Sequence, residues 1–63
     1  MKNFIVSYKR SDVFQTMIVK AENIDSAEEF FKRYKADAVL YGLREQANIN
    51  EEQRKGMPIV VAR

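Results

Sequence analysis

Two residue types that carry much of the chemistry of small proteins are missing: the 63 residues include no histidine and no cysteine. Histidine supplies most general acid–base catalysis near neutral pH, while cysteine supplies thiol nucleophiles, disulfides and many zinc ligands. Glycine occurs only twice and proline once, so no glycine-rich phosphate-binding loop can be built. These absences predict that the protein is not an enzyme and that it holds no metal ion or cofactor.

The size and charge of the chain predict a small single domain, residues 1–63. A chain of this length buries only about 60% of the surface that its unfolded form exposes, and without disulfides or zinc such chains often rely on oligomerisation. The net charge of +2 is weak, and the hydrophobic share of 46% is typical of a folded domain. The apolar run Phe4–Val6 is too short for a signal peptide or a membrane helix. We expect a cytoplasmic protein that does not associate with membranes.

The first third of the chain predicts an antiparallel β-hairpin. Residues 3–9 alternate in polarity, and residues 13–21 are rich in β-branched and aromatic side chains. A polar turn at residues 10–12 separates them. With Ser11 and Asp12 as the loop, Phe4 faces Val19, Val6 faces Met17 and Tyr8 faces Gln15; a shift of one residue would exchange the faces of the second strand.

An amphipathic helix follows the hairpin. Asp25 is the predicted N-cap, with Glu28 three residues later completing a capping box, and Ser26 is the alternative cap. The apolar stripe recurs at helical spacing and is turned toward a core. It consists of Ala27, Phe30, Phe31 and Tyr34.

The segment 38–43 either extends this helix or forms a strand. A strand is favoured, because Gly42 inside a helix costs about 1 kcal/mol relative to alanine. Asn50 is a candidate cap for a short helical turn that Gly56 ends, and residues 58–62 form a last strand. The prediction is an α+β fold, β-β-α-β-β, in which an antiparallel-type sheet carries one amphipathic helix on one face. The alternative is β-β-α-β with a long helix.

Apolar residues occupy both faces of the predicted sheet, whereas a single short helix covers only one. A solvated outer face would be more polar, so we expect an exposed apolar patch that marks a protein interface. The expected partner is a second copy, giving a homodimer, or a different protein. The predicted interface residues are Ile5, Phe14, Ile18 and Val60.

Nucleic-acid binding is the alternative function. Basic residues lie at the hairpin tip and at the end of the helix, and exposed aromatic rings could stack on single-stranded bases. Acidic residues at 28–29 and 51–52 weaken this reading, because mixed charge is the ordinary pattern of a solvated surface. The residues proposed for this role are Lys9, Arg10, Lys32, Arg33 and Lys35.

The junction at residues 19–30, VKAENIDSAEEF, resembles the strand-to-helix junction of small phage and mobile-element proteins such as the DpnD/PcfM-like family. In those proteins a strand ending in V-x-A leads into a capped helix that begins with paired glutamates, whereas here Ala27 precedes the glutamates. The resemblance implies a small accessory protein of a mobile element that works by binding. It carries no catalytic residue over to this chain.

Overall fold

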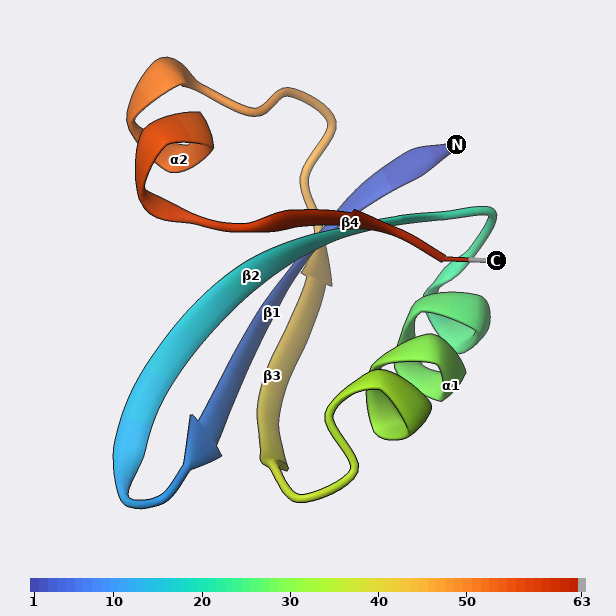
Figure 1. Cartoon of the computed structure of the whole chain (residues 1–63). Coiled ribbons are helices and arrows are strands. Elements are labelled where there is room, and N and C mark those ends of the chain that lie inside the picture. The colour runs from blue at the N-terminus through green and yellow to red at the C-terminus, as the bar shows by residue number, and fades with distance from the viewer. Residues whose placement is uncertain (63) are drawn as a thin grey trace.

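The computed structural model describes residues 1–62 and shows a small α+β fold with a four-stranded sheet of order β3-β1-β2-β4 (Figure 1). One helix is long and the other is a short turn. In chain order the elements are β1 (Lys2–Arg10), β2 (Val13–Ala21), α1 (Ile24–Tyr34), β3 (Val39–Glu45), α2 (Glu51–Gly56) and β4 (Ile59–Val61).

The predicted hairpin register is confirmed: Phe4 pairs with Val19, Val6 with Met17 and Tyr8 with Gln15. The two loop residues, Ser11 and Asp12, have φ of 52° and 63°. Two successive positive φ values are those of a type I′ turn, whose twist matches that of the flanking strands. This turn fixes which side chains of β1 and β2 share a face.

Helix α1 begins earlier than predicted. Its N-cap is Asn23, whose side-chain oxygen accepts a hydrogen bond from the backbone N–H of Ser26 at 2.8 Å. The assignment of Asp25 as N-cap, with Ser26 as the alternative, is therefore wrong. Asp25 lies inside the first turn, where its charge suits the positive end of the helix dipole. The predicted stripe packs on the sheet through buried Ala27 and Phe31.

Residues 39–45 form a strand, as the favoured reading predicted, and β3 pairs antiparallel with β1. The register shifts at Ser7/Tyr8, because Gly42 lies opposite Ser7 while Leu40 lies opposite Tyr8. Tyr41 is therefore an extra residue in β3, a β-bulge. A bulge re-aims a side chain, and here it brings Tyr41 to the face that also carries Ser7.

The expectation of an antiparallel-type sheet is wrong at one edge, because β4 runs parallel to β2. Strand β3 is antiparallel to β1 and therefore parallel to β2. The chain leaves β3 at one edge, crosses the sheet and returns as β4 at the other edge in the same direction. The sheet is mixed, and the segment 46–58, which we call the strap, makes this crossing.

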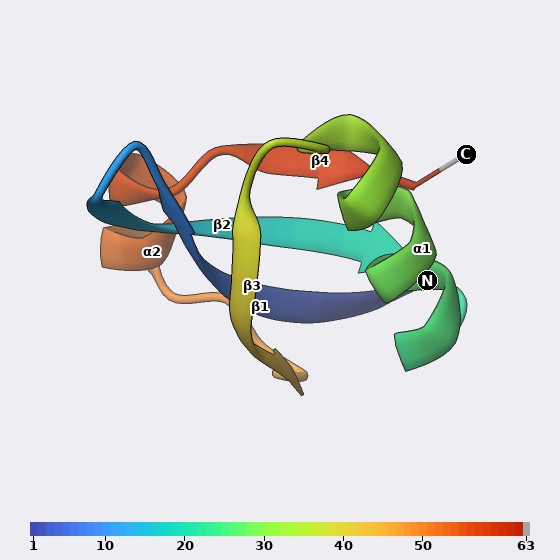
Figure 2. The same cartoon turned by 90° about the horizontal axis from the view of Figure 1, so that it is seen from below.

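The two crossings lie on opposite sides of the sheet. The connection through α1 passes from β2 to β3, and the strap passes back in the other direction, from β3 to β4. Crossovers between parallel strands are right-handed almost without exception, so two crossings in opposite directions must use opposite faces. The two views agree with this: α1 and α2 lie at opposite sides of the molecule in Figures 1 and 2.

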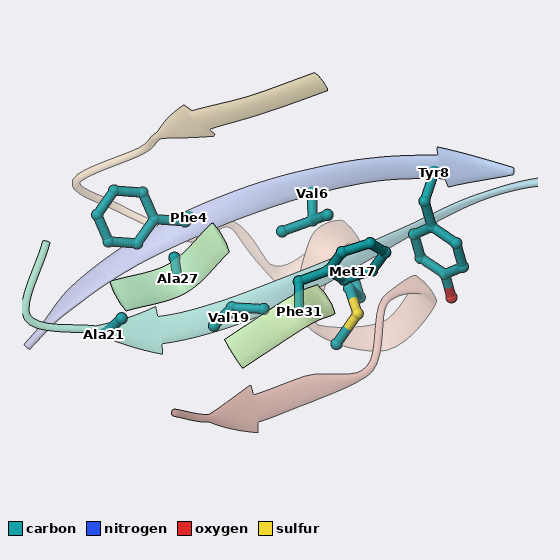
Figure 3. Packing of buried hydrophobic residues seen from close by; sticks show 8 residues of the cluster. All are labelled: Phe4, Val6, Tyr8, Met17, Val19, Ala21, Ala27 and Phe31. Carbon is teal, nitrogen blue, oxygen red and sulfur yellow. The ribbon is translucent and has the colours of Figure 1, made fainter. Parts of the chain in front are cut away.

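The face beneath α1, here called the inner face, holds the main core. Even-numbered residues of β1 and odd-numbered residues of β2 point to it. Figure 3 shows these side chains meeting Ala27 and Phe31 of the helix. The cluster consists of Phe4, Val6, Tyr8, Met17, Val19, Ala21, Ala27 and Phe31.

The turn geometry makes Asp12 a site where glycine should stabilise the protein. Non-glycine residues in the left-handed region carry a steric cost, so Asp12→Gly should raise the free energy of unfolding by about 0.5 to 1 kcal/mol. Asp12→Ala is the matched control, because it keeps the steric cost and should be less stable than the parent. Urea unfolding of the three proteins measures both changes. Equal loss of stability in the two variants would contradict the type I′ turn.

Candidate protein-binding surface

The opposite, outer face of the sheet is divided into a covered half and an open half. Ile5 and Ile18 are direct partners in the β1–β2 register and lie in the covered half. Their exposed fractions are 3% and 0%, although neither belongs to the cluster beneath α1. The prediction that Ile5 and Ile18 form an exposed interface is therefore wrong, because they are buried within their own chain.

The strap passes over this covered half. At its start the backbone N–H of Gln46 donates to the carbonyl of Asn3 at 2.9 Å. At its end the carbonyl of Pro58 accepts from the N–H of Ile18 at 2.8 Å. Between these points a shallow hollow is lined by sheet residues and strap residues together, namely Asn3, Lys20, Ala47, Asn48, Ile49, Arg54 and Ile59.

The strap holds its shape through polar contacts of its own. Asn50 caps α2 as predicted, with its side chain accepting from the N–H of Gln53 while the Gln53 side chain accepts from the N–H of Asn50. The Gln53 amide also exchanges two hydrogen bonds with the amide of Gln46, at 2.6 and 3.1 Å. Of the α2 residues Glu51–Gly56, none is buried. The strap is therefore a polar cover over a small apolar strip.

Val60 lies on the inner face, so its assignment to the outer face is also wrong. The parallel register places Val60 beside Val19, and Val60 packs against the core cluster under α1. Its neighbours Ile59 and Val61 point outward instead and are 44% and 39% exposed. Sequence alternation alone does not give this result, because the face depends on the register of β4 against β2.

The open half of the outer face carries the fourth predicted interface residue, Phe14, which is 67% exposed. Its ring contacts that of Tyr41, with centroids 5.2 Å apart and planes at 65°. Val39 lies opposite Lys9 in the same row and is exposed like Tyr41. Phe14, Val39 and Tyr41 form what we call the open patch. Sequence reasoning identified only Phe14, since the position of Tyr41 depends on the bulge.

One cation, Lys9, lies at the open patch, and two more lie farther along the outer face beside the covered half. The Lys9 ammonium lies 5.4 Å from the centre of the Phe14 ring and 3.6 Å from the Asp12 carboxylate. Arg44, opposite Ile5, points to the same face, as does Lys20, opposite Asn3. Among the strand residues of the described chain, every charged side chain assigned to the outer face by the register is basic. The acidic residues of α1 lie on the other side of the sheet, whereas Glu51 and Glu52 lie on α2 of the strap, which crosses this face.

The residues proposed for nucleic-acid binding do not form a uniform basic surface. Arg10 and Lys32 make ion pairs with Asp37 at 2.9 Å and Glu28 at 3.2 Å, and Lys9 has the Asp12 contact. The Lys35 ammonium lies 5.2 Å from the Tyr34 ring centre. Arg33 lines a separate hollow beside Glu29. The Arg10–Asp37 pair links the hairpin tip to the connection between α1 and β3.

Comparisons with other proteins add no further assignment: no family model, curated protein or solved structure matches this chain. Within residues 1–62, no three acidic side chains gather closely enough to hold a metal ion. Over the same residues, neither helix has the length and apolar character needed to span a membrane.

The covered half makes a clear prediction about stability. Ile18→Ala should lower the free energy of unfolding by about 2 to 5 kcal/mol, as expected for a fully buried side chain. Thr16 lies on the same strand and the same face but is exposed, so Thr16→Ala should cost less than about 1 kcal/mol. Chemical denaturation of both variants tests this. A small loss in Ile18→Ala would mean that the strap does not cover the outer face.

Proposed function

We propose that the protein is a non-enzymatic protein-interaction module and that the open patch is its contact surface. The observation that carries the proposal is the exposed Phe14–Tyr41 pair beside Val39, on a face where the central residues Ile5 and Ile18 are buried. Aromatic side chains are enriched at protein interfaces, and they dominate binding energy where they become buried. Exposing this group of side chains is unfavourable unless a partner covers it.

The polar side chains around the patch support binding. Ser7 and Thr16 lie in the next row of the outer face, and Lys9 lies between Phe14 and Val39. The hydroxyl groups can form a polar border on one side of the apolar side chains, and the Lys9 ammonium lies among them, over the Phe14 ring. In such an interface the aromatic rings contact the partner, and the neighbouring polar side chains fix the partner's orientation through hydrogen bonds.

Protein contact is better supported than nucleic-acid contact. Four of the five basic residues considered for nucleic acid already lie beside a carboxylate or an aromatic ring of their own chain. A carboxylate next to a cation repels the phosphate backbone and weakens counterion release, which drives such binding. The open patch also includes Val39, which offers no face for base stacking.

The homodimer predicted from the sequence is one form of this proposal, and a role as an accessory protein of a mobile element is compatible with it. In a two-fold contact the patch of one protomer meets the same patch of its partner. Lys9 and Arg44 of each copy then approach the same two cations of the other copy, and like charges repel. Salt screens this repulsion, so self-association through the patch should strengthen as ionic strength rises.

Sedimentation equilibrium tests the homodimer. The parent protein should have a mass above that of a monomer at high concentration, and more so in high salt. Phe14→Asp should shift it toward monomer, because a carboxylate replaces the central ring. Tyr34→Asp is the matched control, since Tyr34 is also an exposed aromatic residue but lies on α1, outside the patch. A parent that is monomeric in every condition would contradict the homodimer, and the next experiment then decides whether the patch binds another protein.

A further inference from the structure

We propose that the open patch and the free edge of β3 together bind an extended acidic segment of a partner protein, which adds to the sheet as a fifth strand beside β3. This inference rests on the proposed function, because it uses the same face. Beyond the proposed function, the inference specifies that the partner segment is extended and that it is acidic. Three features support it: an open edge, a row of apolar side chains beside that edge, and the exposed cation Arg44 on the outer face of β3.

The backbone of β3 is available on one side. Among the strands of residues 1–62, β3 is last in the order and pairs only with β1. The hydrogen bond from the N–H of Gln46 to Asn3 shows that the even-numbered residue at this end faces β1. Because backbone groups alternate along a strand, Arg44 and Gly42 also face β1, while Leu43 and Glu45 point their N–H and C=O groups to the open edge.

This edge has few of the features that protect edge strands from pairing. Edge strands are commonly blocked by proline, by inward-pointing lysine, by a β-bulge or by being very short, and of these β3 has only the bulge at Tyr41. Strand β3 has seven residues and contains neither proline nor lysine. The other edge, β4, has only three residues and follows Pro58. An added strand is therefore expected at β3 and not at β4.

The bulge limits where pairing can occur. A bulge interrupts the regular edge at Tyr41, so the added strand pairs best from Gly42 toward Glu45. The same bulge turns the Tyr41 ring onto the outer face against Phe14. A strand laid along β3 would thus gain backbone hydrogen bonds at one end and apolar contact with Tyr41 and Val39 at the other. Peptides bind exposed sheet edges by this combination.

The positive charge beside β3 favours an acidic partner segment. On the outer face, the side chains of an added strand lie beside Arg44 of β3, whereas the Lys9 ammonium lies farther in, over the Phe14 ring. A carboxylate of the added strand would pair with Arg44, and apolar residues would cover the patch. A second copy brings its own Lys9 and Arg44 to the contact, so an acidic segment of a different protein fits this edge better.

Hydrogen exchange measured by NMR tests the inference on the full chain. The probe is a short synthetic peptide of alternating glutamate and valine, and the control peptide has lysine in place of glutamate. At about ten times its dissociation constant, the acidic peptide should slow exchange of the Leu43 and Glu45 amides by about tenfold. The Gly42 and Arg44 amides already face β1 and serve as internal controls. Binding should weaken as salt is added.

Arg44→Glu is the matched variant, because Arg44 is exposed and its replacement should leave the fold intact. The variant should lose the response to the acidic peptide and gain one to the lysine peptide. Shifts of the Phe14 and Tyr41 resonances without protection of Leu43 and Glu45 would overturn the added strand but leave the open patch as a contact surface. If no peptide shifts either ring and the parent is monomeric, the proposed function fails as well. Tighter binding of oligothymidylate than of the acidic peptide would overturn both in favour of nucleic acid.

Discussion

The structure depends on burying both faces of the central β1–β2 pair. Side chains alternate along these strands, so Val6 and Met17 point to one face while Ile5 and Ile18 point to the other, and all four are buried. Helix α1 reaches only the first of these faces. The second is closed by the strap, which crosses from one edge of the sheet to the other. A chain of 63 residues without cysteine thereby buries apolar side chains on both faces of its central strands.

The crossing of the strap also explains the arrangement of the edges. It places β4 beside β2 and leaves β3 as the longer free edge. It covers Ile5 and Ile18 but does not reach Phe14 at the far end of the hairpin. The covered half and the open patch are therefore two results of one connection. The functional proposal concerns the part of the outer face that this connection leaves exposed.

Local features of the fold could be predicted from the sequence, and long-range ones could not. The register of the hairpin follows from its two-residue loop, and the Asn50 cap follows from a side chain that bonds a nearby backbone group. The sequence does not single out the N-cap of α1, because Asn23, Asp25 and Ser26 are all good capping residues within four positions. The parallel pairing of β4 and the position of Val60 depend on the path of the strap, which no local pattern encodes. The same holds for the surface: Phe14 could be predicted from alternation, whereas Tyr41 joins it only through the bulge.

The order in which the chain leaves the ribosome gives the strap a further consequence. Once β3 has emerged, α1 can close over the inner face, because nearly all of that core comes from residues 4–43. Ile5 and Ile18 remain exposed to solvent until residues 46–58 have been synthesised and can cover them. During this interval the nascent chain exposes the apolar side chains of Ile5 and Ile18 as well as Phe14, separated by the Ser7–Thr16 row, and chaperones that bind extended apolar segments could bind there. Of these three side chains, the finished protein leaves only Phe14 exposed.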